Sequence, residues 1–99
     1  MHRGKELTFK DTFFFGREAA GNHMVVAGPM TSRRHAKIEL RGGRFVLVDQ
    51  SSNGTFVTLG GNAEMRLRRE EAILYGSGVI ALGQSAAAAG EDAIEFHCG

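Results

Sequence analysis

Three short polar clusters interrupt the apolar runs of this sequence and contain the side chains that could take part in binding or catalysis. They are Gly16-Arg17, Ser32-Arg33-Arg34-His35 and Ser52-Asn53-Gly54-Thr55. Their guanidiniums, hydroxyls and amide suit a phosphate attached to a peptide, because arginine donates a rigid fork of hydrogen bonds and hydroxyls reach the remaining phosphate oxygens. No acid pair, activated nucleophile or metal-ligand cluster accompanies them, so the clusters predict binding rather than catalysis.

The energy of such a site requires the clusters to act together. One charge-assisted hydrogen bond contributes about 1.5–3 kcal/mol. Two or three could turn a weak peptide contact into a micromolar one, which needs roughly 8 kcal/mol in total. We therefore expect the clusters to be loops gathered at one end of a rigid scaffold.

Length and charge limit the class of protein. The 99 residues predict one small domain covering 1–99, and a hydrophobic fraction of 42% suffices for a single core. The net charge is only +1. A nucleic-acid-binding domain usually carries a basic excess over its whole surface, so we expect no nucleic-acid partner, and any anion site must be a local concentration of arginine.

The single cysteine, Cys98, allows no disulfide framework within the chain, which fits a reducing compartment. The apolar stretches are too short to span a bilayer, and residues 1–5 show no signal peptide. We predict a cytoplasmic location without a membrane partner. The abrupt start and the alanine-rich tail suggest a module of a longer protein.

Short apolar runs separated by glycine-rich breaks indicate strands rather than helices. Ala36, Ile38 and Leu40, for example, share one face of an extended segment. The pair Gly42-Gly43 follows and predicts a tight hairpin turn. Strands at intervals of roughly eight to twelve residues predict an all-β sandwich or barrel. The predicted strands occupy residues 6–9, 12–15, 24–26, 36–40, 45–48, 55–58, 72–75, 79–82 and 93–96.

Two segments also have helical potential. The stretch 67–72 contains only residues that a helix tolerates, so a short helical turn within 64–75 is an alternative to a strand. The alanine run within 85–90 is too short to hold as an isolated helix. We predict a flexible hairpin loop there, between the last two strands.

The clusters and their surroundings resemble the forkhead-associated (FHA) domain in both order and spacing. The segments concerned are residues 15–17 (FGR), 31–36 (TSRRHA) and 49–57 (DQSSNGTFV), and residues 79–83 (VIALG) resemble the late core strand of that family. The resemblance implies an all-β, FHA-type sandwich of two antiparallel sheets with recognition loops at one end. It also implies a non-catalytic signalling adaptor that needs no cofactor or metal and binds a phosphothreonine-containing protein or peptide.

The resemblance further implies a role for individual residues. Arg17 would contact the phosphate or the peptide backbone, Ser32 would bind the phosphate, and Arg33 would add a second basic contact. The Ser52 hydroxyl would also reach the phosphate, and Asn53 would bind the peptide main chain around the phosphothreonine.

Gly16, His35 and Gly54 would form the scaffold of these loops, the glycines by permitting the turns and the histidine by bracing them. The sequence departs from the family before the late strand, because residues 76–78 (GSG) lack the usual Asp and put a structural turn in doubt. Met30 lies near the expected selectivity position, and its apolar side chain argues against a required acidic residue downstream of the phosphothreonine.

Other interpretations of the same residues stay open. The domain could dock partners without phosphate and regulate a fused enzyme, since residues 67–71 are similar to FHA modules of class III nucleotide cyclases in bacterial signalling proteins. Arg34 is interpreted as an optional charge at the rim, and Asn53-Gly54 could be a type I′ turn. Two further rivals are a nucleic-acid binder using Arg33, Arg34, Arg68 and Arg69, and a hydrolase using Ser32 and His35.

Overall fold

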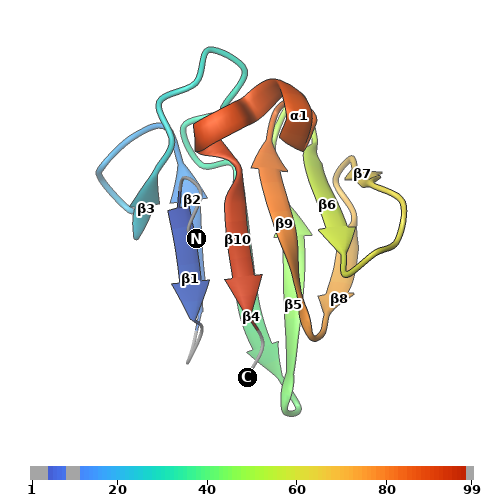
Figure 1. Cartoon of the computed structure of the whole chain (residues 1–99). Helices are drawn as coiled ribbons and strands as arrows, with labels where there is room; N and C mark the ends of the chain where they lie inside the picture. Colours follow the sequence, from blue (N-terminus) through green and yellow to red (C-terminus); the bar gives the residue numbers. More distant parts are fainter. Residues whose placement is uncertain (1–4, 9–11, 98–99) are drawn as a thin grey trace.

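The computed structural model describes residues 5–8 and 12–97, and this part of the chain forms two stacked β-sheets (Figure 1). One sheet has the order β1-β10-β9-β6-β7 and the other the order β3-β2-β4-β5-β8. The sandwich is therefore confirmed. The strands are β1 (Lys5–Thr8), β2 (Phe13–Gly16), β3 (Met24–Val25), β4 (Ala36–Arg41), β5 (Arg44–Asp49), β6 (Thr55–Leu59), β7 (Met65–Leu67), β8 (Glu71–Leu74), β9 (Ser77–Leu82) and β10 (Ile94–His97).

The strand pairs are mostly antiparallel, as expected, with two exceptions. The first strand, β1, pairs with β10 in parallel, and β2 pairs with β3 in parallel. The loop 17–23 carries the chain back along the sheet edge, so that the two-residue β3 runs in the same direction as β2. Parallel neighbours need such a return, because a tight turn can only reverse the chain.

The hairpin of β4 and β5 forms as predicted. Gly42 and Gly43 have φ values of 56° and 82°, which are the positive angles of a type I′ turn. The register pairs Arg41 with Arg44 and continues along both strands. Ala36 and Ile38 face the interior with 1% and 0% exposure, which confirms the alternation for these two residues, whereas Leu40 near the hairpin turn is 44% exposed.

The core lies between the two sheets and is built from aliphatic and aromatic side chains of both. Burying one such side chain contributes about 1.5–3 kcal/mol relative to exposure. The core holds the strand ends, and hence the loops that leave them, in fixed positions. Its largest fully buried apolar members are Phe15, Ile38, Leu47, Val57, Ile80, Ile94 and Phe96.

The stretch 64–75 forms two strands, so the helical alternative is wrong. β7 lies at the edge of one sheet and β8 at the edge of the other, and the sequence patterns missed β7. Arg69, between them, has a φ of 59° and is the one non-glycine residue with positive φ in the described ranges. This conformation costs roughly 1–2 kcal/mol and cannot continue a helix. Further on, Tyr75 and Gly76 connect β8 to β9 across the sandwich, so the turn put in doubt by the missing Asp does form.

The alanine run is helical, which corrects the prediction of a flexible loop. Residues Ala86–Ala89 form α1, followed by a 3₁₀ turn over Gly90–Asp92. The Ser85 hydroxyl accepts a hydrogen bond from the Ala88 amide (3.3 Å), and Glu64 Oε2 accepts one from the Ala86 amide (2.9 Å). These acceptors satisfy amides that an isolated turn would leave unpaired. None of the described helices combines the length and apolarity required to cross a membrane.

Candidate functional site

The three polar clusters lie in three loops at one end of the sandwich, opposite the β4–β5 hairpin (Figure 1). We name them the first loop (residues 17–23, after β2), the second loop (residues 26–35, before β4) and the third loop (residues 50–54, between β5 and β6). Backbone hydrogen bonds join them to one another. The Arg17 amide donates to the Ser32 carbonyl (2.9 Å), and the Gln50 amide donates to the His35 carbonyl (2.8 Å).

Two of the predicted hydroxyl residues are adjacent across the second and third loops. The Ser52 amide donates to Ser32 Oγ (3.3 Å). Ser32 is half-buried, whereas Ser52 and Arg17 are exposed. Because Ser32 Oγ acts as an acceptor here, its hydroxyl proton remains available for a further acceptor such as a phosphate oxygen.

The neighbouring arginines of the second loop are directed differently. The Arg33 side chain is 71% exposed and lies 3.9 Å from the Glu18 carboxylate, a distance and exposure that give a weak ion pair. The Arg34 guanidinium instead lies against the backbone of Gly21 and lines a hollow with Phe14 and Gln50. Arg33 and Arg34 therefore do not form one continuous basic surface.

Asn53 uses its side chain and its backbone in separate contacts. Its Nδ2 donates to the Met30 carbonyl (3.0 Å), which leaves its Oδ1 and a second N–H proton for other partners. Its carbonyl accepts two hydrogen bonds from the Arg66 guanidinium, at 2.8 Å and 3.2 Å. Asn53 has no positive φ, so the type I′ turn considered for Asn53-Gly54 is wrong.

His35 is fully buried and links the second loop to the third. Its Nδ1 accepts from the Ser32 amide (3.0 Å), and its Nε2 therefore carries the proton donated to the Gly54 carbonyl (2.7 Å). Burial lowers the pKa of His35 below its ordinary value, although the hydrogen bond to Gly54 and the charge of Asp49 partly oppose the shift. Both ring nitrogens face backbone groups, so this geometry offers no base to the Ser32 hydroxyl.

The two scaffold glycines occupy places where a side chain would not fit. A Cβ on Gly16 would collide with the Arg33 carbonyl, so the close approach of the first and second loops requires glycine here. Gly54 has a φ of 93°, and a Cβ there would lie 2.9 Å from Arg66 Nε. The third loop therefore needs glycine at this position, because the backbone angle is positive and because the Arg66 side chain occupies the space of a Cβ.

The sequence patterns missed Asn22, which joins the first loop to the second. Its Nδ2 donates to the carbonyls of Glu18 and Arg33, both at 2.7 Å. Its Oδ1 is buried and has no hydrogen-bond partner among the described residues. An asparagine next to a glycine resembles any turn, so the sequence carries no signal for this bridge.

The sequence patterns also missed a buried hydrogen-bond network beneath the third loop. Asp49 Oδ1 accepts from the hydroxyls of Ser51 and Thr55, both at 2.6 Å, and its Oδ2 accepts from the Arg69 amide (2.9 Å). Arg69 Nε donates to the Ser51 carbonyl (3.0 Å). Arg69 is thus engaged with the protein backbone rather than free for a nucleic acid.

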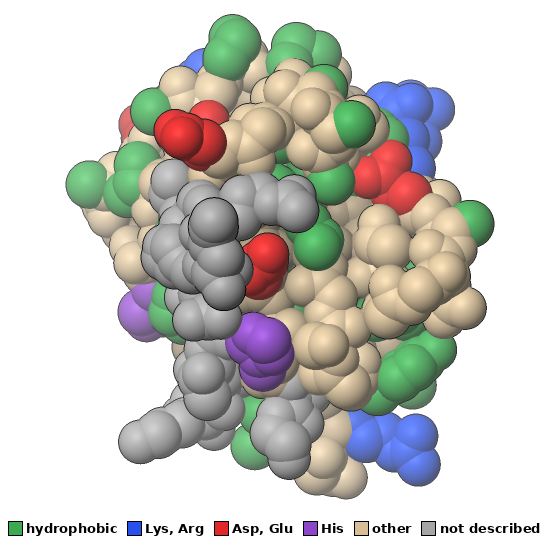
Figure 2. All heavy atoms as spheres, in the orientation of Figure 1, with side chains coloured by type: hydrophobic (Ala, Val, Ile, Leu, Met, Phe, Trp, Pro, Cys, Tyr) green, Lys and Arg blue, Asp and Glu red, His purple; other side chains and the backbone are tan. Residues whose placement is uncertain are grey.

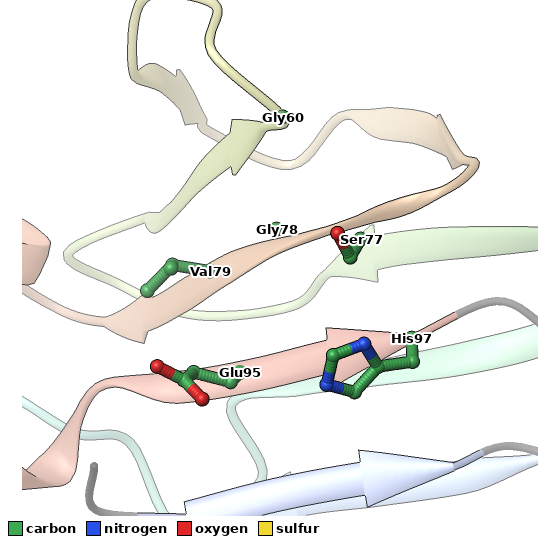
Figure 3. Close-up of a pocket in the computed structure, with 6 residues that line it drawn as sticks. All are labelled: Gly60, Ser77, Gly78, Val79, Glu95 and His97. Atoms are coloured by element: carbon green, nitrogen blue, oxygen red, sulfur yellow. The ribbon is translucent and has the colours of Figure 1, made fainter. Parts of the chain in front are cut away.

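Figure 2 shows that the described side chains on the face of the sheet formed by β10, β9, β6 and β7 are mostly apolar or uncharged, with no continuous stripe of basic side chains among them. A hollow of about 370 Å³ lies on the same face, lined by side chains and glycines of β9 and β10 and by Gly60 (Figure 3). It is shallow sheet surface apart from the three loops. Within residues 5–8 and 12–97, no group of three or more His, Cys, Asp or Glu side chains could hold a metal ion.

The chain was compared with families and with proteins of known structure. The family model of the FHA domain matches residues 13–83. The solution structure of the FHA domain of an Arabidopsis thaliana hypothetical protein is 31% identical, with a TM-score of 0.63 over 77% of this chain and 64% of that chain. No curated protein matches the sequence significantly.

Two further similar structures are complexes. EmbR of Mycobacterium tuberculosis, solved with a low-affinity phosphopeptide, is 30% identical, with a TM-score of 0.58 over 71% of this chain and 17% of that chain. The FHA domain of FhaA, solved with the intracellular domain of Rv3910, is also 30% identical, with a TM-score of 0.56 over 76% of this chain and 75% of that one. The loops, the sandwich and the match over residues 13–83 agree, and the chain belongs to the FHA domain family.

Proposed function

We propose that residues 1–99 form a single FHA domain that binds phosphothreonine-containing proteins or peptides as a non-catalytic signalling adaptor. FHA domains are interaction modules whose relatives bind phosphopeptides, as EmbR does. One observation carries the proposal. Three loops bring two adjacent serines, Ser32 and Ser52, and arginines without strong ion pairs to one end of a rigid sandwich.

The proposal assigns the phosphate to Arg17, Ser32, Arg33 and Ser52. A phosphothreonine carries about −1.5 to −2 charges and three acceptor oxygens, so it can accept from two guanidiniums and two hydroxyls. Among the described residues, the Arg17 guanidinium makes no ion pair, and the pair of Arg33 with Glu18 is long and exposed. Releasing that pair costs little, because exposed ion pairs contribute about 0–1 kcal/mol.

Asn53 would bind the peptide main chain with its Oδ1 atom and with the N–H proton of Nδ2 that does not bond to the Met30 carbonyl. Gly16, His35 and Gly54 would act only through the positions of the loops. Their contacts support this division, because Gly16 and Gly54 make room for Arg33 and Arg66 while both nitrogens of His35 face backbone groups.

The finer context is part of the same proposal. We place the domain in the cytoplasm, since a single cysteine fits a reducing compartment. We place it in a bacterial signalling protein, because one of the similar structures with a phosphopeptide is a Mycobacterium tuberculosis protein.

A peptide titration tests the proposed function. A peptide selected from an oriented phosphopeptide library is measured by calorimetry with phosphothreonine, phosphoserine and unmodified threonine at the same position. We expect the phosphothreonine form to bind at micromolar affinity, phosphoserine more weakly and unmodified threonine not measurably. Equal affinity for all three would contradict the proposal and favour docking without phosphate.

Two variants connect the binding to the loops. Arg17→Ala and Ser32→Ala are expected to abolish binding with little change in melting temperature, because Arg17 is exposed and Ser32 keeps its backbone contacts. Arg44→Ala is the matched control, since Arg44 lies at the hairpin end and is also exposed. It should bind as the unmodified domain does.

A further inference from the structure

We propose that Arg34, Phe14 and Gln50 form a second anion subsite, which takes an acidic side chain of the same peptide that carries the phosphothreonine. This inference rests on the proposed function and deepens it. It assigns a use to Arg34, which the phosphate site leaves unused.

The subsite is a hollow on the outer face of the β3-β2-β4-β5-β8 sheet, directly below the recognition loops. Its volume is about 390 Å³, and it is lined by Phe14, Gly21, Arg34 and Gln50. Phe14 lies on β2 beside Phe15, whose side chain is buried in the core, so the Phe14 ring points to the opposite, outer face. Four separate segments thus meet at this hollow.

The walls of the hollow are held in place by contacts outside it. The Phe14 ring stacks on His23 at a centroid distance of 5.6 Å and an interplanar angle of 14°. The Phe14 amide also donates to His23 Nδ1 (3.0 Å). Gln50 is fixed through its backbone amide, which donates to the His35 carbonyl (2.8 Å). A preformed wall lowers the ordering cost of binding.

Arg34 lines this hollow and forms no ion pair with any of the described residues. Its guanidinium lies flat enough against Gly21 that a Cβ there would be 3.0 Å from Nη2 and 3.3 Å from Cζ. The Glu18 carboxylate of the first loop instead lies 3.9 Å from the Arg33 guanidinium. The charge of Arg34 therefore remains available to a ligand.

The donors of the hollow suit a carboxylate. A guanidinium fork matches the two oxygens of a carboxylate, and the side-chain amide of Gln50 can donate a further hydrogen bond. The Phe14 ring excludes water from one side, which strengthens a charge-assisted contact. None of the described residues that line this hollow carries a hydroxyl, unlike the phosphate site with Ser32 and Ser52.

The position of the subsite predicts that acidity matters on one side of the phosphothreonine only. Arg34 follows Ser32 by two residues, and it lines the hollow together with Phe14 of β2. Met30 precedes Ser32 by two residues and packs against Gly83, at the end of β9 in the other sheet. The phosphate site therefore has a cationic flank and an apolar flank. An extended peptide advances about 3.3 Å per residue, so a few residues reach from the phosphate to Arg34.

A glutamate scan of the peptide tests this inference. A single Glu is walked through a neutral phosphothreonine peptide, from about four residues before to about four after the phosphothreonine. We expect Glu at one or two adjacent positions, on one side only, to raise the affinity of the unmodified domain about fivefold. Arg34→Gln should remove that gain and leave the affinity for the neutral peptide nearly unchanged.

Arg44→Gln is the matched control, because it removes the same charge at the other end of a molecule 32 Å long. Screening at about 0.1 M salt acts over about 10 Å, so this variant should keep the gain from Glu. Melting temperatures of both variants report whether each one folds.

Two results would overturn the subsite. One is an equal loss of affinity for neutral and Glu-bearing peptides in Arg34→Gln, which would make Arg34 a general or phosphate-contacting charge. The other is a gain from Glu that survives in Arg34→Gln. Failure of the proposed function itself is recognised separately, by equal binding of the phosphorylated and unmodified neutral peptides.

Discussion

The first and third loops lie at the same end of the sandwich and are each hydrogen-bonded to the second loop, but they are held in different ways. The third loop is supported from below by the buried Asp49 carboxylate, which accepts three hydrogen bonds. The first loop is joined to the second by the side-chain amide of half-buried Asn22 and by backbone hydrogen bonds from Arg17 and Glu18, and to β2 by the His23 amide, which donates to the Phe14 carbonyl. Support of the third loop is therefore part of the folding energy, whereas support of the first loop mainly sets the position of Arg17.

The largest expected effect tests the support of the third loop. Asp49→Ala leaves the Ser51 and Thr55 hydroxyls and the Arg69 amide without their acceptor in a buried site. Each buried group without a partner costs about 1–3 kcal/mol, so we expect the free energy of unfolding to fall by about 3 kcal/mol or more in urea titrations. Asp49→Asn, which keeps one acceptor oxygen, should lose less. A loss below 1 kcal/mol for the alanine variant would show that the network adds nothing to stability.

The next prediction concerns the first loop. Asn22→Ala removes both bridges to Glu18 and Arg33, so phosphopeptide affinity should fall about tenfold. Stability should change by less than about 1 kcal/mol, because the buried Oδ1 without a partner already offsets part of the gain. Calorimetry and urea unfolding measure the two quantities, with the exposed Asn62→Ala as control. If Asn22→Ala unfolded as easily as Asp49→Ala, the contrast between the loops would be lost.

A smaller effect is expected at Arg66, which holds the third loop from its exposed side. It donates twice to the Asn53 carbonyl, and its guanidinium carbon lies 5.3 Å from the centre of the Phe56 ring. Arg66→Gln should lower the free energy of unfolding by about 1 kcal/mol and weaken phosphopeptide binding about threefold. Arg68→Gln removes an equal charge from an exposed neighbour and should do neither. Equal effects of the two variants would mean that only net charge matters.

The smallest effect is the pH dependence of the link between the second and third loops. Burial holds the pKa of His35 below 6.5, so the unfolded chain takes up a proton at a higher pH than the folded domain. The free energy of unfolding should therefore be highest above pH 6.5 and fall as the pH drops toward the folded pKa.

Unfolding in urea at about pH 7.5 and about pH 5.5 measures this dependence. His35→Gln is the control, because an amide cannot titrate in this range while it can still contact Ser32 and Gly54. The free energy of unfolding of His35→Gln should depend less on pH than that of the unmodified domain. An identical dependence in both proteins would assign it to other groups.

Local patterns predicted the sandwich and most of its strands. The alternation along residues 36–40 and the Gly42-Gly43 turn depend on neighbours in the chain, so the sequence alone was enough for them. The order and spacing of the polar clusters likewise indicated the FHA family, which the match to residues 13–83 confirms. The gathering of the three loops at one end was expected because the clusters must act together to bind a phosphate.

Contacts between distant residues decided the rest. The turn α1 receives, besides its local Ser85 cap, an acceptor from Glu64, which lies 22 residues away and is absent from an isolated helix. The Arg69 side chain donates to the Ser51 carbonyl, so it does not join Arg68 in the basic group that the sequence suggested. Arg33 and Arg34 are identical and adjacent in sequence, yet the Arg34 guanidinium lies beside Gly21 whereas that of Arg33 lies near Glu18. Hydrogen bonding and packing across the sheets, rather than residue type, selected these outcomes.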